Sequence, residues 1–154
     1  MINHIDDEKW MNLALQEAKL AFKEGEIPVG AVLVKDGVLI AKGHNKREKK
    51  NDISSHAEIE VLRKTSKKTK NWKLEGYTIY VTLEPCLMCA GAIIQSKISR
   101  LVFGCFDKDR GAICSKINSI EEFKLDSPLL VTTSVLEKEC QDLINRFFAD
   151  IRKK

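Results

Sequence analysis

Three possible metal ligands and one carboxylate stand out in this sequence of 154 residues. His56 is followed two positions later by Glu58, and the motif Pro85-Cys86-Leu87-Met88-Cys89 comes further along the chain. One imidazole and two thiolates can occupy three of the four tetrahedral positions of a zinc ion. Catalytic zinc sites keep the fourth position open to water, whereas structural sites close it with another side chain. The pattern therefore predicts hydrolysis at a zinc-bound water.

Glu58 is the candidate proton shuttle of this site. A positioned carboxylate can take a proton from the water, place it on a ring nitrogen, and later protonate the departing amine. Positions i and i+2 of a regular helix do not share a face. We therefore expect His56 to lie at or before the first helical turn. An alternative is a capping box, in which Ser55 caps the helix and Glu58 only satisfies a backbone N–H.

Two other interpretations of the cysteines remain open at this point. A Cys-x-x-Cys at the start of a helix is also typical of thioredoxin-like redox proteins, although these lack the upstream His-x-Glu. A purely structural zinc site would need a fourth ligand, and the plausible donors are His44, Cys105 and Cys114. Leu87 and Met88, between the two thiols, are expected to pack in the interior.

Apolar periodicity and turn residues predict the elements that position these residues. Helices are expected at 7–23, 56–68, 86–95, 120–123 and 136–151, and strands at 31–34, 38–41, 77–82, 101–103 and 129–133. Strand–helix–strand alternation in the middle of the chain predicts parallel pairing there. We expect an α/β fold in which one domain, residues 1–154, forms a three-layer α/β/α sandwich around a mixed five-stranded sheet.

Composition narrows the class of protein. Hydrophobic residues make up 44% and charged residues 31% of the chain, which is ordinary for a globular protein. No apolar run approaches the roughly 20 residues needed to cross a bilayer, and the acidic, polar start does not resemble a signal peptide. Five cysteines including a Cys-x-x-Cys favour a reducing, cytoplasmic location, with Cys105, Cys114 and Cys140 as buried thiols.

Basic side chains are unevenly distributed, although the net charge is only +4. They cluster at 46–50, just before the His-x-Glu, at 63–73, and at the C-terminal residues 152–154. Such clusters attract phosphate groups and give salt-dependent affinity for nucleic acids. The alternative is that these runs are simply solvated loops and helix faces.

The motifs taken together resemble those of the bacterial tRNA-specific adenosine deaminases, which belong to the cytidine deaminase-like superfamily. The matching segments are Pro28-Val29-Gly30-Ala31-Val32, Gly43-His44-Asn45, His56-Ala57-Glu58-Ile59, Thr82-Leu83-Glu84-Pro85-Cys86-Leu87-Met88-Cys89-Ala90-Gly91-Ala92-Ile93, Val102-Phe103-Gly104, Leu136-Glu137-Lys138-Glu139-Cys140 and Phe147-Phe148. The core motif is shared with cytosine, guanine and cytidine deaminases. Segment 86–93 and the terminal Phe147-Phe148 are more particular to the tRNA enzymes.

This resemblance implies a hydrolase that converts adenosine to inosine at the wobble position of a tRNA anticodon arm. It implies one zinc ion per subunit, no nucleotide cofactor, no membrane association and a homodimer. It also implies that Glu58 is catalytic, that Asn45 hydrogen-bonds the flipped base, and that Asp107 lies near the neighbouring ribose. Asn45 and Asp107 are otherwise ordinary turn and loop residues, and Glu84 either supports the metal site or caps a helix.

Three segments depart from the usual pattern of this family. Residues 52–55 read Asp-Ile-Ser-Ser where Asp-Pro-Thr-Ala is usual, Phe106 stands where a basic residue is common, and segment 125–128 lacks the usual polar pattern. These departures concern recognition of the anticodon loop and leave the chemistry untouched. The competing functions are a free-base deaminase acting on guanine or cytosine, and a catalytically inactive RNA-binding zinc domain.

Overall fold

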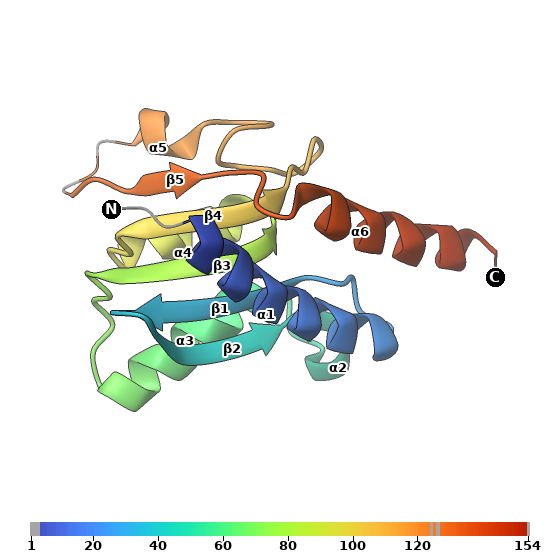
Figure 1. Cartoon of the computed structure of the whole chain (residues 1–154), viewed down its shortest axis with the longest axis horizontal. Coiled ribbons are helices and arrows are strands. Elements are labelled where there is room, and N and C mark those ends of the chain that lie inside the picture. Colours follow the sequence, from blue (N-terminus) through green and yellow to red (C-terminus); the bar gives the residue numbers. More distant parts are fainter. Residues whose placement is uncertain (1–3, 124, 126, 154) are drawn as a thin grey trace.

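The computed structural model describes residues 4–123, 125 and 127–153 (Figure 1). The helices are α1 (His4–Lys23), α2 (Arg47–Lys50), α3 (Ala57–Thr69), α4 (Leu87–Gln95), α5 (Ser119–Glu122) and α6 (Glu137–Arg152). The strands are β1 (Gly30–Lys35), β2 (Val38–His44), β3 (Tyr77–Leu83), β4 (Arg100–Cys105) and β5 (Leu130–Thr132). Every element expected from the sequence is present within a few residues, and α2 is an addition.

The strands form one mixed sheet in the order β2-β1-β3-β4-β5. Strand β1 pairs antiparallel with β2 and β3, whereas β3–β4 and β4–β5 are parallel. Because β1 alone reverses direction, β2, β3 and β4 all end at the same edge of the sheet. In open α/β sheets, ligands bind beyond the carboxyl ends of the strands. The topology therefore brings the segments after residues 44, 83 and 105 together.

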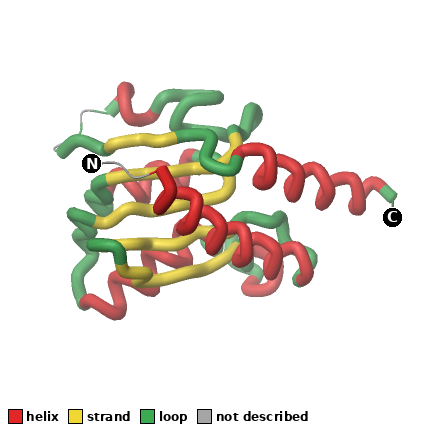
Figure 2. The backbone as a smooth tube through the Cα atoms, viewed as in Figure 1, coloured by secondary structure: helices red, strands yellow, loops and turns green. Residues whose placement is uncertain are grey.

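Helices cover both faces of the sheet, so the predicted three-layer sandwich is confirmed (Figure 2). Helices α1 and α6 lie on one face, and α3 and α4 lie on the other (Figure 1). Side chains of a strand point alternately to opposite faces. In β1, Ala31 and Leu33 accordingly join the core under α3 and α4, while Val32 and Val34 join the core under α1. The sheet that positions the site is therefore packed on both of its faces.

The structure corrects several expectations about individual residues. Leu87 and Met88 were expected to pack inside, but Leu87 is 61% exposed and Met88 is also exposed. Cys114 was expected to be buried and is exposed, whereas Cys105 and Cys140 are buried. These misassignments arise because an amphipathic pattern does not show which face of a short helix or loop finds a partner.

Segment 125–128, one of the three departures from the family pattern, lies partly outside the described residues, since residue 126 is not among them. Residue 154, the last of the C-terminal basic run, also lies outside them. Within the part of the chain that the structure describes, no helix is both long enough and apolar enough to cross a membrane.

Candidate active site

The three expected metal ligands converge between the starts of α3 and α4. Nδ1 of His56 lies 3.6 Å from Sγ of Cys86 and 3.5 Å from Sγ of Cys89, and the three ligand atoms all lie within 4.8 Å of one another. Tetrahedral zinc with bonds of about 2.0 Å to nitrogen and 2.3 Å to sulfur places those atoms about 3.5 Å apart. The donor set and its spacing therefore fit a zinc ion.

His56 lies outside the helix that follows it, as the spacing required. It is the N-cap residue of α3 with φ −75° and ψ 158°, an extended conformation, and makes no side-chain cap. The hydroxyl of Ser55 donates to the carboxylate of Asp52 at 3.2 Å. The capping-box interpretation is therefore wrong. Cys86 is likewise the extended N-cap residue of α4, and Cys89 lies in the first turn of that helix.

Glu58 lies in the first turn of α3 and is only 4% exposed. Its carboxyl group contacts the thiol of Cys89, and burial raises the pKa of Glu58 to about 7. Hydrogen bonding from Cys89 and, to a smaller extent, from His56 outweighs burial and lowers the pKa of Cys86 to about 4, which favours its thiolate. The same contact with Cys86, together with burial, raises the pKa of Cys89. A carboxyl group with a pKa near neutrality can both give and take protons.

The side chains considered for a fourth ligand do not reach this cluster. His44 lies between the carboxylates of Glu17 and Glu24, at 3.1 and 3.2 Å. The thiol of Cys105 donates to the carbonyl oxygen of Thr82 at 3.4 Å. Over the described residues, the metal-ligating group consists of one imidazole and two thiols. All five cysteines are free, so the two thiols are not joined as a redox disulfide.

Asn45 is held firmly where β2 ends. Its Nδ2 donates to the carbonyl oxygen of Ile27 at 3.2 Å, and its Oδ1 accepts from the backbone N–H of Arg47 at 3.1 Å. A side-chain amide has two N–H donors and two acceptor positions on its oxygen. Asn45 thus keeps one of each for a ligand while its orientation is fixed. It is both the expected turn residue and a residue of the cleft described next.

A cleft of about 940 Å³ opens above the metal ligands and contains the other expected site residues. Its wall includes His56, Glu58 and Cys86, together with Asn45 and Asp107. Acidic, basic, polar and apolar side chains complete it: Ile27, Val29, Arg47, Leu83, Glu84, Phe106, Lys108, Asp109, Arg110, Glu137, Lys138, Gln141, Asp142, Ile144 and Phe148. Since α6 contributes the last six of these, the C-terminal helix forms part of the site, which its periodicity alone did not show.

Two buried carboxylates lie beside this cleft: the sequence pattern did not single out Glu26, and it left two alternatives open for Glu84. Glu26 accepts the backbone N–H groups of Glu48 and Lys49 at 3.0 and 2.8 Å, and thereby holds α2 beside the cleft. Glu84 caps no helix and accepts N–H groups from the loop after β4. Burial opposes ionisation of Glu84, but hydrogen bonds from Ser115 and from backbone N–H groups hold its pKa below the usual value.

The two departures that the structure describes have local explanations. Asp52 Oδ1 accepts both the N–H and the hydroxyl of Ser54, at 2.9 and 2.7 Å, and so holds a turn in the segment that departs from the pattern. Phe106 packs edge-on against Phe103, with ring centroids 5.2 Å apart. The aromatic ring thus lines the cleft at a position that is commonly basic.

Known proteins provide an independent comparison. A family model described as MafB19-like deaminase matches residues 5–150. The tRNA-specific adenosine deaminase of Bacillus subtilis is 44% identical over 148 residues, which cover 96% of this chain and 92% of that protein. The enzyme of the same name from Haemophilus influenzae is 46% identical over 149 residues, 96% of this chain and 86% of its own.

Solved structures agree with the sequence comparison. A structure from a study of A-to-I editing by tRNA:A34 deaminases at the wobble position of transfer RNA superposes with a TM-score of 0.85. It is 38% identical and covers 88% of this chain and 98% of its own. Fold, cluster and sequence similarity agree along nearly the whole length. The chain therefore belongs to the MafB19-like deaminase family, among the tRNA-specific adenosine deaminases.

Proposed function

We propose that this protein converts adenosine to inosine at the wobble position of a tRNA anticodon arm. The observation that carries the proposal is the buried Glu58 beside the His56, Cys86 and Cys89 cluster, at the base of a cleft. The activity named for its relatives, including the chloroplastic tRNA(adenine(34)) deaminase of Arabidopsis thaliana at 42% identity, supports it. Residues 1–154 act as one deaminase domain in the cytoplasm, where tRNA and reduced thiols occur together.

Zinc is the proposed cofactor, one ion per subunit, held by His56, Cys86 and Cys89. When bound there, it lowers the pKa of a water molecule to roughly 7 and so supplies a nucleophile at neutral pH. The neutral imidazole and two thiolates balance the charge of the ion. The extended N-cap positions of His56 and Cys86 aim these ligands at one point before either helix begins.

Glu58 transfers the protons of the reaction. Its carboxylate takes one proton from the attacking water and delivers it to a ring nitrogen of the purine. Once the C6–O bond has formed, Glu58 takes the remaining proton of the added hydroxyl group and passes it to the amino group, and the C6–N bond breaks. Ammonia departs, inosine remains, and the carboxylate returns to its starting state. Burial serves these steps because it raises the pKa of Glu58 to about 7.

The cleft accounts for recognition of a base taken out of its stack, as nucleobase deaminases require. Asn45 uses its remaining donor and acceptor on the purine edge, and Asp107 faces the ribose of the neighbouring nucleotide. Arg47, Lys108 and Arg110 stand at the wall of the same cleft and suit the phosphates of an RNA strand.

The decisive experiment is an inosine assay on a tRNA with adenosine at the wobble position. Zinc-loaded protein is expected to form inosine there, and none in a matched tRNA with guanosine at that position. Because basic side chains neutralise phosphates, activity at limiting tRNA should fall by more than about tenfold between about 50 and about 200 mM salt. Deamination of free guanine or cytosine with no conversion of tRNA would instead establish a free-base deaminase.

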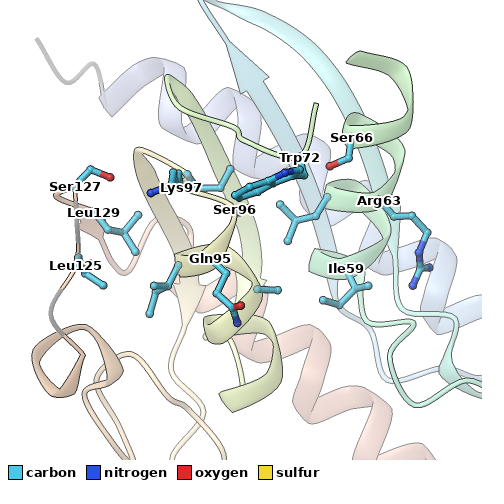
Figure 3. A pocket seen from close by; sticks show the side chains of 14 residues that line it. Ile59, Arg63, Ser66, Trp72, Gln95, Ser96, Lys97, Leu125, Ser127 and Leu129 are labelled. Carbon is cyan, nitrogen blue, oxygen red and sulfur yellow. The ribbon is translucent and has the colours of Figure 1, made fainter. Parts of the chain in front are cut away.

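The proposal includes a homodimer formed through the face that α3 and α4 present to solvent. A groove of about 560 Å³ runs along this face, and Figure 3 shows Ile59 and Arg63 of α3 on one side and Gln95 of α4 on the other, with Trp72 above them in the view. Trp72, which lines the groove, is 58% exposed, and the groove is also lined by the apolar residues Ile59, Leu62 and Ile98. Exposed apolar side chains around a groove are typical of a protein interface.

Light scattering after gel filtration tests the dimer. The wild-type protein is expected to have about twice the chain mass of 17.5 kDa. Trp72→Glu should shift it to the monomer mass, because a carboxylate would have to be buried unpaired in the interface. Val38→Glu replaces an equally exposed apolar residue on β2 and should leave the dimer intact. A wild-type protein with the mass of one chain would contradict this part of the proposal.

A further inference from the structure

One wall of the cleft is a long loop that forms neither strand nor helix, although Ala112 and Ile113 within it are buried in the core. Residues 106–118 lie between β4 and α5, and Phe106–Arg110 line the cleft. Buried backbone N–H groups need acceptors, which regular structure normally supplies. We propose that Glu84 is a positioning residue for the substrate: its carboxylate replaces that regular structure and fixes the wall. The role of the wall in binding tRNA rests on the function proposed above.

The contacts of the Glu84 carboxylate follow the loop from end to end. Glu84 is 2% exposed. Its Oε1 accepts the backbone N–H of Asp107 at 3.1 Å, and its Oε2 accepts those of Ile113, Cys114 and Ser115 at 3.2, 2.8 and 3.0 Å. The hydroxyl of Ser115 donates to Oε1 as well. An ionised carboxylate has about four acceptor positions, and these five donors occupy all of them, with Oε2 shared among three N–H groups. A single side chain thus ties residue 107 to residues 113–115.

Close packing adds to these hydrogen bonds. The backbone N–H of Ala112 donates to the carbonyl oxygen of Pro85 at 2.9 Å, so the loop is also tied to the backbone next to Glu84. A Cβ atom at Gly111 would overlap the carboxyl group of Glu84. The absence of a side chain at Gly111 is what lets the loop pass directly over the carboxylate. The loop that forms the wall is therefore packed directly against the Glu84 carboxylate at Gly111.

Fixing the backbone of Asp107 also fixes the basic residues that follow it. Asp107 Oδ1 accepts the N–H groups of Asp109 and Arg110, at 3.2 and 3.1 Å. The turn that carries Lys108 and Arg110 thus keeps its place only while Asp107 keeps its own. Among the described residues, the carboxylate of Glu84 makes no hydrogen bond to His56, Cys86 or Cys89. Its loss should consequently impair binding of the RNA and leave zinc in place.

Glu84→Gln is the test, because glutamine has nearly the size of glutamate but no charge. Its NH2 group would replace one carboxylate oxygen and face the N–H donors of the loop, to which it cannot bond. The KM for tRNA is expected to rise about tenfold, with kcat within about threefold of wild type, which is the signature of lost binding. Zinc should remain at one ion per chain. Hydrogen exchange should accelerate in a peptide covering 107–115, since local protection depends on those hydrogen bonds.

Two further variants make the result interpretable. Asp7→Asn removes a carboxylate that is 1% exposed and pairs with Arg100 at the opposite edge of the sheet. It should lower the Tm without changing the KM or the exchange of 107–115. Ser115→Ala removes one hydrogen bond from Glu84 at an exposed position, and should reproduce the changes of Glu84→Gln on a smaller scale.

Loss of zinc in Glu84→Gln would overturn the inference, because the carboxylate would then support the metal ligands. Kinetics identical to those of Asp7→Asn would also overturn it, as would unchanged exchange of 107–115 in both Glu84→Gln and Ser115→Ala. The exchange comparison needs no RNA. A wild-type protein that forms no inosine would thus contradict the proposed function, while the exchange data would still decide whether Glu84 holds the wall.

Discussion

Glu58→Gln is expected to lower kcat for inosine formation by about 10²–10⁴ while zinc content and tRNA affinity stay at their wild-type values. Glutamine matches glutamate in size but can neither accept the proton of the water nor return it to the leaving amine. Since all the proton transfers pass through this one side chain, no other group on the cleft wall takes them over. The measurement is a single-turnover rate at saturating tRNA, which separates chemistry from product release.

The matched control for this variant is Glu60→Gln, two residues along the same helix. Glu60 is also buried, but its carboxylate accepts hydrogen bonds from Lys50 Nζ at 2.9 and 3.2 Å and does not line the cleft. Its replacement should cost stability and leave the single-turnover rate within about threefold of wild type. A Glu58→Gln protein that turns over as fast as Glu60→Gln would show that the proton shuttle is another group.

Cys89→Ala is expected to reduce bound zinc from one ion per chain to near zero and to bring inosine formation to background. With one thiolate missing, two donors are left for an ion that its site holds with three protein ligands. Metal analysis by mass spectrometry and the inosine assay measure the two effects. Treating the wild-type protein with a chelator should have the same outcome, and added zinc should restore the wild-type protein but not the variant.

Thermal unfolding supplies a second readout that does not depend on activity. Zinc that binds only the folded chain stabilises it by about 2.7 kcal/mol when free zinc is about a hundred times the Kd. The Tm of the wild-type protein should therefore rise with added zinc, whereas that of Cys89→Ala should not. Cys114→Ala is the control, since this thiol is exposed and outside the cluster. Full zinc content in Cys89→Ala would rule out the proposed ligand set.

Much of the fold could be inferred from local sequence pattern. Apolar periodicity located the long helices and the strands, because the spacing of apolar residues in a segment follows from the face that the segment buries. The residues of the cluster could also be predicted, since an imidazole and two thiols at the starts of two helices suit few functions other than metal binding. Even the extended backbone of His56 followed from geometry, because Glu58 could not otherwise face the same point.

Other features depended on residues that are far apart in the chain. No local pattern shows that α6 closes the cleft, that Leu87 is exposed, or that Glu84 carries the loop at 107–115. The carboxylate of Glu84 is polar and buried, and such a residue is explained only by its partners. Those partners lie beyond β4, and only the assembled sheet brings them to Glu84.

The amino-acid sequence by itself determined the chemistry of this protein, because ligand type and spacing are properties of short segments. The tertiary structure alone decided the shape of the substrate cleft. Strands β2, β3 and β4 end at one edge because only β1 runs against them, and this sheet order places Asn45, Glu84 and Asp107 around the metal ligands. Sheet order is a long-range property, set by crossover connections and by burial of both faces at once.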